Sequence, residues 1–329
     1  MKYRSTGMFM LIIAILLMVA LFLFSCVKLL ESTLLPKVDV QEQFQTRTIV
    51  RDGVSYYPRQ DINVVLLIGT DTDGKIQDSG SYNNKSSADM VALLVFDEDR
   101  EEFYVLSLNR DTMLDIPVLG LNGRQAGSVY AQLATSHNYG SGMSDSCENT
   151  RKAVSDFLYG LTIDHYFCMN MDGIGILNDS VGGVEVEIQD DFSQVDPSLV
   201  QGSTMVLNGE QAYSFVRSRA SMVGSKLNVS RMDRQRQYME GFVDSLRESL
   251  TLDEMFFAEL WKNISDYAVT DCSTVVLNSL ASDYADYRFA GSLTPEGENV
   301  LGEKYYEFYA DEKLLDELIL KLFYRQTSS

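Results

Sequence analysis

Two apolar runs constrain the fold of this chain more than any other feature of its sequence. Residues 62–68 read INVVLLI and residues 90–96 read MVALLVF, and neither run alternates between apolar and polar positions. A strand with such a pattern is buried on both of its faces. Both sides of the resulting sheet must therefore be covered, which predicts helices packed against a central sheet.

The elements around these runs predict an α/β class with a central mixed sheet. A third strand, residues 103–108, follows a charged turn and forms a hairpin with the second run. The clearest helix is residues 230–250, which Ser230 would cap with Asp233 as its box-like partner. Shorter elements are helices at 149–159, 252–264, 271–282 and 311–324, and strands at 184–188 and 302–309. Strands and helices interleave, so we expect one layered domain.

An uncharged apolar segment lies near the N-terminus. Residues 8–24 are all apolar or small, and continuing to Val27 gives 20 residues, enough to span a bilayer core as a helix. Lys2 and Arg4 precede it, which favours a cytoplasmic N-terminus. A cleaved signal peptide is the main rival, although no A-x-A site follows, and a lipoprotein modified at Cys26 is the other. The predicted organisation is a cytoplasmic N-terminus (1–7), a single-pass signal anchor (8–27), a stalk (28–60) and an extracytoplasmic domain (61–329).

The charge balance and the scarcity of histidine exclude several classes of protein. The chain has 27 Lys and Arg against 47 Asp and Glu, a formal charge of −20. A nucleic-acid-binding protein needs a basic surface, so that class is excluded. The two histidines, His137 and His165, argue against a multi-histidine metal site, and the four cysteines have no metal-like spacing. Cys147, Cys168 and Cys272 are compatible with one disulfide and one free thiol, or with three buried free thiols.

Two carboxylates flank the first two strands. Asp71 follows the first strand and Asp89 begins the second, and antiparallel neighbours bring these positions to one sheet edge. Mg²⁺ prefers one or two carboxylates together with phosphate and water, so this pair is a candidate metal site. The alternative is a purely structural role, in which an Asp after a strand serves only as a turn or cap residue.

Arginines are concentrated in the motifs that follow. Arg110 and Asp111 come directly after the third strand, and five arginines lie within residues 217–236. Arg231, Arg234 and Gln235 share one side of the predicted 230–250 helix, in its first turns, where free N–H groups favour an anion. Arginine binds phosphate through bidentate hydrogen bonds. The pattern therefore predicts a pyrophosphate pocket that is basic within an acidic surface, against the alternatives of a surface ion pair and a solvated helix face.

In this order, the motifs resemble the LytR-CpsA-Psr family of bacterial cell-envelope proteins. The matching segments are NVVLLIGTD (63–71), SADMVALLVF (87–96), VLSLNRDTMLDIP (105–117), GIGILNDSVGGVEVEI (173–188), LNGEQAYSFVRSR (207–219) and SRMDRQRQYMEGFVDSL (230–246). They cover the core region 61–250 and leave residues 251–329 as a C-terminal extension of the same domain.

The resemblance implies a deep apolar groove for a polyprenyl chain and a phosphotransferase activity. Such an enzyme moves a glycopolymer, for instance a teichoic acid or capsular polysaccharide, from a polyprenyl-pyrophosphate carrier in the cytoplasmic membrane to peptidoglycan, with Mg²⁺ assisting. Carried over by position, the roles are metal binding for Asp71 and Asp89, pyrophosphate binding for Arg110, Arg217, Arg219, Arg231, Arg234 and Gln235, and catalysis for Arg110, Asp111 and Arg219. A wall-sugar hydroxyl would attack the phosphorus in line with the leaving lipid phosphate.

The sequence also departs from the family pattern. Asp73 and Ser87 stand where the family usually has Arg, Asn228 where it has Asp, and Ser230 where it has Gly. Lys75 or Lys85 is a candidate replacement for a missing cation. Two alternatives therefore stay open: a degenerate domain that binds polyprenyl-phosphate lipid or assists a partner without catalysis, and a membrane-tethered regulatory protein that binds neither lipid nor metal.

Overall fold

The computed structural model describes residues 48–120, 123–218, 226–252 and 256–326. The chain divides into two compact units, one comprising Arg59–Arg325 and the other Met1–Pro58 with Gln326–Ser329. The predicted anchor (8–27) and Arg219 lie outside the described residues. Within the described ranges, no helix combines the length and apolarity needed to cross a membrane.

A six-stranded mixed sheet forms the centre of the larger unit. Its strands are β3 (Ile62–Thr70), β4 (Ala88–Asp97), β5 (Glu102–Leu108), β8 (His165–Asn170), β11 (Ala268–Thr270) and β12 (Arg288–Leu293). Their order is β11-β8-β3-β4-β5-β12. The pairs β3–β8 and β5–β12 are parallel, and the other three pairs are antiparallel. The predicted mixed sheet and the β4–β5 hairpin are confirmed.

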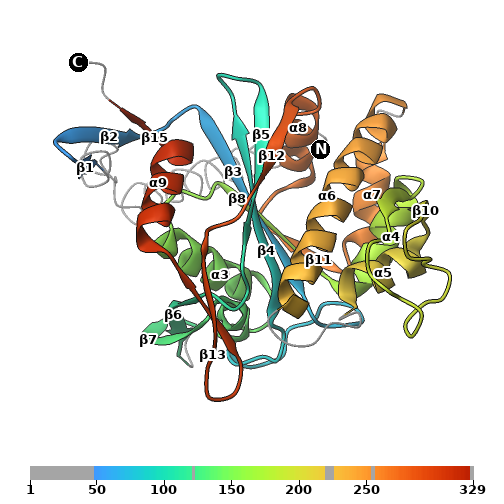
Figure 1. Cartoon of the computed structure of the whole chain (residues 1–329), viewed down its shortest axis with the longest axis horizontal. Helices are drawn as coiled ribbons and strands as arrows, with labels where there is room; N and C mark the ends of the chain where they lie inside the picture. Colours follow the sequence, from blue (N-terminus) through green and yellow to red (C-terminus); the bar gives the residue numbers. More distant parts are fainter. Residues whose placement is uncertain (1–47, 121–122, 219–225, 253–255, 327–329) are drawn as a thin grey trace, which may run out of the picture. The chain divides into compact units, whose positions relative to one another are not determined.

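Helices cover both sides of this sheet. They are η1 (Leu133–Asn138), α3 (Ser144–Phe157), α4 (Met171–Ser180), α5 (Gly209–Arg217), α6 (Lys226–Leu252), α7 (Phe256–Ile264), α8 (Thr274–Asp283) and α9 (Glu312–Phe323). Figure 1 shows α3 and α9 on one side of the central strands and α6 on the other. This burial explains the two apolar runs, because Leu66 on β3 and Leu93 on β4 are completely buried.

Short strand pairs lie outside the central sheet. They are β6 (Met113–Leu119) with β7 (Gln125–Gln132), β9 (Val184–Glu187) with β10 (Thr204–Leu207), and β13 (Gly297–Leu301) with β14 (Tyr306–Ala310). The smaller unit contains the hairpin of β1 (Ile49–Arg51) and β2 (Val54–Pro58), and the last strand of the chain is β15 (Tyr324–Gln326). The predicted strand at 302–309 was placed too early, since β14 begins at Tyr306.

A second apolar core holds α5 and α6 against the β9–β10 pair. Val184, Phe215 and Tyr238 are buried together there, and the rings of Phe192 and Phe215 stack with centroids 5.8 Å apart. The helix α4 approaches α5 so closely that a Cβ on Gly209 would lie 2.8 Å from the backbone oxygen of Gly175. Glycine is therefore needed in this part of the LNGEQAY motif for packing.

The predicted N-terminus of the long helix is wrong. Helix α6 begins at Lys226, four residues before Ser230, so Ser230 is an internal residue and not a cap. Only the first four N–H groups of a helix lack an intrahelical partner. Arg231, Arg234 and Gln235 follow that first turn, so the free N–H groups of the helix do not reinforce an anion site around them.

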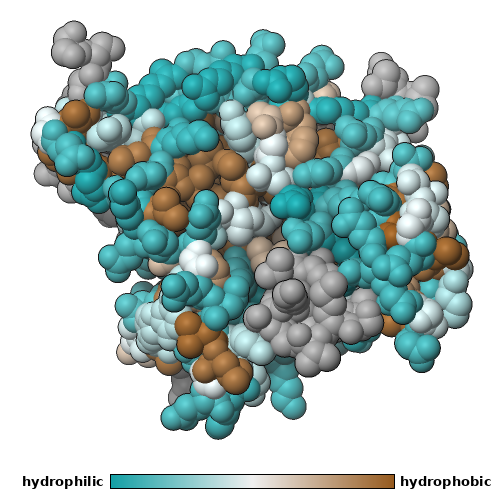
Figure 2. Space-filling view, in the orientation of Figure 1, coloured by the Kyte–Doolittle hydropathy of each residue, from teal (hydrophilic) through white to brown (hydrophobic). Residues whose placement is uncertain are grey.

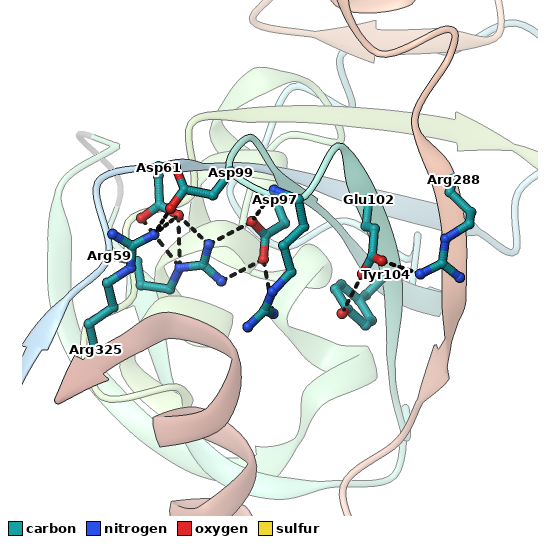
Figure 3. A network of polar contacts seen from close by, with 9 residues as sticks. Arg59, Asp61, Asp97, Asp99, Glu102, Tyr104, Arg288 and Arg325 are labelled. Atoms are coloured by element: carbon teal, nitrogen blue, oxygen red, sulfur yellow. Dashed lines mark hydrogen bonds and ion pairs between the residues drawn. The ribbon is translucent and has the colours of Figure 1, made fainter.

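An ion-pair network links the residues just before β3 to the last residue of β4. Figure 3 shows Arg59 between the carboxylates of Asp61 and Asp97, with Nη1 of Arg59 2.7 Å from Oδ2 of Asp97. Only 1% of the Asp97 side chain is exposed. Burial alone would raise the pKa of Asp97, but the hydrogen bonds and charge of Arg59 outweigh it and hold that pKa below its usual value. The same carboxylate also accepts from Arg100.

The face drawn in Figure 2 is mostly hydrophilic, as expected for so acidic a chain. Apolar side chains gather beside α9, at the left of the view, and near the tip of the β13–β14 hairpin. The hairpin tip includes Val300 and Leu301, which are 43% and 68% exposed.

Candidate functional site

Asp89 lies at the centre of the candidate site, held by two arginines from different elements. Its Oδ2 is 3.0 Å from Nη1 of Arg231 on α6, and its Oδ1 is paired with Nη1 of Arg110 after β5. Asp89 is 7% exposed and Arg231 is 3% exposed. A buried carboxylate is thus held between two guanidinium groups. The structure thus brings three of the sequence motifs into contact.

A β-bulge turns Asp89 toward α6. Gly69 of β3 opposes Met90, and the next residue, Thr70, opposes Ala88, so Asp89 is an extra residue in β4. Such a bulge re-aims a side chain that strict alternation would point to the other face. A Cβ on Gly69 would lie 3.1 Å from the Cβ of Met90, so glycine permits the close approach at this point. The bulge is what brings Asp89 within reach of Arg231.

A narrow cleft of about 20 Å³ lies beside this cluster, between α6 and the sheet. Its polar lining comes from Asp89, Arg110, Ser107, Gln235 and Arg236. Its apolar lining comes mainly from methionine and leucine, namely Met90, Leu108, Met232 and Met239. The cleft thus combines charged and apolar side chains, a combination that suits an amphiphile with an anionic head.

Asp111 supports Arg110 and is itself deeply buried. Its Oδ1 lies 3.6 Å from Nε of Arg110 and accepts a hydrogen bond of 3.0 Å from Gln132. The backbone carbonyl of Asp111 accepts from Phe308 of β14. With 4% exposure and these partners, Asp111 is placed to orient Arg110.

Asp71 follows β3 at the same end of the β3–β4 pair. Its Oδ1 accepts a hydrogen bond of 2.8 Å from the backbone N–H of Ser87, and its own N–H donates to the carbonyl of Ser87. The Asp71 side chain is exposed, in contrast to buried Asp89. Ser87, where the family usually has Arg, therefore fixes Asp71 through its backbone.

Arg217 belongs to a separate, exposed cluster. It ends α5, donates to the hydroxyl of Tyr213, and lies 3.8 Å from Oδ1 of Asp73. The Tyr213 hydroxyl also contacts Asp73 at 3.1 Å. Asp73 therefore pairs with Arg217 at the position where the family usually has an arginine. Tyr213 was missed from the sequence, although its spacing of four residues from Arg217 was the available signal.

Arg234 is committed to the fold around α5. Its Nε donates to the carbonyl of Phe215 at 2.9 Å, and its two terminal nitrogens reach Asp190 and the carbonyl of Ser218. The guanidinium also lies over the ring of Phe192, 5.4 Å from its centroid. These contacts place Arg234 as a clamp on the α5 C-terminus.

Other residues singled out in the sequence fall in less informative positions. The side chain of Asn228 and the whole of Arg219 lie outside the described residues. Lys75 pairs with Asp266 at 2.5 Å on the surface, while Lys85 lines a second cleft with Lys75. Gln235 is buried and lines the first cleft.

The carboxylates have the chemistry that a magnesium ion needs. Within the described part of the chain, Oδ1 of Asp89 is a buried oxygen that accepts no hydrogen bond, although Arg110 pairs with it. Asp71 supplies a second, accessible carboxylate at the end of the neighbouring strand. Hard oxygen ligands of this kind fit Mg²⁺ once phosphate oxygens complete its shell.

Solved structures match the fold. The chain resembles the gbs0355 protein of Streptococcus agalactiae with a TM-score of 0.64, at 22% identity, covering 80% of this chain and 86% of that one. It resembles TagV of B. subtilis with a TM-score of 0.61, at 20% identity, covering 80% and 96%. At these identities the likeness shows the fold alone.

Sequence comparison identifies relatives of the chain and its family. A polyisoprenyl-teichoic acid–peptidoglycan teichoic acid transferase, TagU of Enterococcus faecalis, is 31% identical over 221 residues, spanning 67% of this chain and 65% of the relative. The chain therefore spans slightly less than two thirds of that relative's length. The model of the LytR_cpsA_psr family matches residues 34–322, which is most of the chain. The chain belongs to the LytR_cpsA_psr family.

Proposed function

We propose that this protein transfers a glycopolymer from a polyprenyl-pyrophosphate carrier to peptidoglycan. The observation that carries the proposal is the buried Asp89–Arg110–Arg231 cluster, of which Asp89 and Arg110 line the cleft beneath α6. The TagU relative is named for transfer of teichoic acid to peptidoglycan, which gives the substrate class. Residues 8–27 would anchor the domain to the outer side of a bacterial cytoplasmic membrane.

The polyprenyl chain would lie between α6 and the sheet. Beyond Met90 and Met239, partly buried apolar side chains continue along this interface, namely Leu94, Phe96, Val243, Tyr287 and Phe289. They surround a buried core of Ala92, Phe103 and Val105. A lipid placed there would leave its pyrophosphate at Arg110 and Arg231, which supports the predicted apolar groove.

Arg110 and Arg231 would bind the pyrophosphate by giving up Asp89 as their partner. Arg110 and Arg231 neutralise Asp89 in the absence of substrate, and phosphate oxygens offer them stronger bidentate partners. The acceptor hydroxyl oxygen forms a bond to the phosphorus that carries the polymer, the bond from that phosphorus to the bridging oxygen breaks, and the hydroxyl proton is released to solvent. Polyprenyl monophosphate leaves, and the guanidinium groups stabilise the charge that develops on it.

Asp71 and Asp89 would hold Mg²⁺ beside the pyrophosphate. The ion would supply charge neutralisation and orientation of the phosphate oxygens. Asp111 would keep Arg110 in position through its contact with Nε and its hydrogen bond from Gln132. Its burial favours this positioning role over that of a general base.

A transfer assay tests the proposed function directly. The full chain in detergent is incubated with Mg²⁺, a polyprenyl-pyrophosphate-linked oligosaccharide and peptidoglycan fragments, and the products are separated by mass spectrometry. We expect a phosphodiester-linked conjugate and release of polyprenyl monophosphate in equal amounts. Lipid bound by the protein without either product, under conditions where a family relative gives both, would contradict the proposal.

The pairing of Asp73 with Arg217 favours the alternative of a lipid-binding domain with little catalysis. Asp73 places a negative charge beside an arginine that the family resemblance assigns to pyrophosphate. Asp73→Arg is therefore expected to raise transfer by roughly tenfold, since removing a like charge near the leaving phosphate is worth about 1–2 kcal/mol at an exposed site.

The matched control for that variant is Asp78→Arg, which makes the same change on another exposed residue of the same loop. It should leave transfer unchanged. If both variants raise transfer equally, general charge and not the Asp73–Arg217 pair controls the rate. If wild type has no activity and Asp73→Arg creates it, the natural chain is the lipid-binding form.

A further inference from the structure

A cluster of one histidine and two cysteines lies outside the site described above. His137 is in the last turn of η1, Cys147 is in the first turn of α3, and Cys168 is on β8. All three are essentially completely buried. Nε2 of His137 lies 3.8 Å from Sγ of Cys168 and 4.0 Å from Sγ of Cys147. The three ligand atoms lie within 4.8 Å of one another.

The spacing of these atoms is close to that of a metal centre. A nitrogen and a sulfur on tetrahedral zinc are separated by about 3.5 Å, given Zn–N and Zn–S bonds of about 2.0 and 2.3 Å. The two distances from His137, 3.8 and 4.0 Å, exceed this by about half an ångström at most. Small rotamer adjustments would therefore bring all three atoms onto one ion.

The histidine already has the orientation of a metal ligand. Its Nδ1 lies 2.9 Å from the backbone carbonyl of Ser86, to which it donates in the tautomer that leaves Nε2 unprotonated toward the thiols. A ring N–H held by a carbonyl is the usual support of a ligating histidine. Asn84 stabilises the surrounding loop by donating to the carbonyls of His137 and Gly140 at 2.8 and 2.7 Å.

A cleft borders two of the three clustered side chains. It measures about 230 Å³, is distinct from the cleft beneath α6, and is lined by His137 and Cys168 together with Thr70, Asn84 and Ser86. An ion could enter through this cleft and keep a water molecule on that side. Two thiolates would make a divalent centre neutral, which lowers the cost of its burial.

We propose that His137, Cys147 and Cys168 bind a thiophilic divalent cation, Zn²⁺, with the fourth coordination position facing the cleft. Thiolate and imidazole ligands favour Zn²⁺ over Mg²⁺. The ion would connect η1, α3 and β8, and through Ser86 it would hold the segment whose next residue, Ser87, fixes Asp71. This proposal does not rest on the proposed transfer reaction.

The other cluster of potential ligands is less suitable. His165, Asp271 and Cys272 also lie close together, but the Asp271 carboxylate is engaged by Arg151 at 3.0 Å and by the N–H of Tyr166 at 3.0 Å. Cys272 therefore provides a matched control: a buried free cysteine whose replacement leaves the proposed ligands intact.

The test measures metal directly. The full chain, purified in detergent without chelators, is analysed for bound metal by elemental mass spectrometry, and the stripped protein is titrated with Zn²⁺ against a chromogenic chelator in excess Mg²⁺. We expect one Zn²⁺ per chain, and an affinity lowered at least tenfold by Cys147→Ser or Cys168→Ser but not by Cys272→Ser. Substitution with Co²⁺ should give the thiolate-to-metal charge-transfer band of a two-sulfur site.

The cobalt spectrum of the wild-type chain keeps the test valid if a serine variant fails to fold. Absence of a thiolate band with no bound zinc would overturn the proposal. So would a Cys147–Cys168 disulfide in protein isolated without reductant, found by mass spectrometry. Zinc affinity lowered equally by Cys272→Ser would assign the ion to the other cluster and overturn it as well.

Discussion

Asp89→Asn is expected to lower glycopolymer transfer by about 10²-fold or more, the usual effect of removing one charge-stabilising group from an active site. Asp89 is the carboxylate that organises Arg110 and Arg231 and, in our proposal, one of two that hold Mg²⁺. An amide cannot neutralise two guanidinium groups, and it is a poor ligand for Mg²⁺. The initial rate of conjugate formation at saturating Mg²⁺ measures the effect.

The matched control is Asp244→Asn, which makes the same change in an exposed ion pair on α6, 3.7 Å from Arg247. It should retain the wild-type rate. Because Asp89 is buried, thermal unfolding of both variants must accompany the assay. A folded Asp89→Asn protein with an unchanged rate would remove Asp89 from the mechanism. Arg110 and Arg231 would then remain as candidate pyrophosphate ligands, without a Mg²⁺ site at Asp89.

Asp97→Asn is expected to lower the free energy of unfolding of the larger unit by about 3 kcal/mol. Asp97 accepts from both terminal nitrogens of Arg59 at 2.7 Å, and almost no part of either side chain reaches solvent (Figure 3). Its removal leaves a buried guanidinium with Asp61 as the remaining carboxylate. Urea unfolding at neutral pH measures the change, and the exposed Asp99→Asn, paired with Arg325, is the control.

The same network predicts how stability depends on pH. Hydrogen bonding to Arg59 lowers the pKa of Asp61, and Arg59 also holds the pKa of Asp97 below the unfolded value of 3.8. The unfolded chain therefore binds more protons in acid, and this stabilisation, complete above the unfolded pKa, is lost as pH falls through the folded values. The free energy of unfolding of the Asp97→Asn variant should therefore fall less than that of wild type as the pH drops from about 5 to about 3. Equal slopes for variant and wild type would contradict the assignment.

Residues whose burial follows from local sequence were predicted well. The strands β3, β4 and β5 were found because their apolar runs need both faces covered, and α3, α7, α8 and α9 because of their helical spacing. Strands with weak or mixed patterns were missed: β6 contains Pro117, β7 is polar, and β8 is short. Helix α5 was missed as an element although its motif was noted, which is why the Tyr213–Arg217 pair was not foreseen.

The candidate site was predicted in part. The order of the motifs placed Asp89, Arg110 and Arg231 in one predicted pocket, and the three side chains are in contact in the structure. Each lies at the end of a buried element or on a helix facing the sheet. Arg217 and Arg234 belong to the same motifs, yet their partners are Asp73 and the α5 C-terminus. A guanidinium on a flexible side chain takes its partner from tertiary packing, which spacing along the chain does not specify.

By itself, the sequence determined the mixed α/β class, the buried strands and the family, because these depend on local patterns of apolar residues and on the order of motifs. Only the tertiary structure decided the direction of Asp89, since a bulge shifts one residue and reverses the face of a strand. It also decided the grouping of His137, Cys147 and Cys168. Their spacing suggested no metal site, but the three elements that carry them meet in the core, and metal chemistry depends on distance in space.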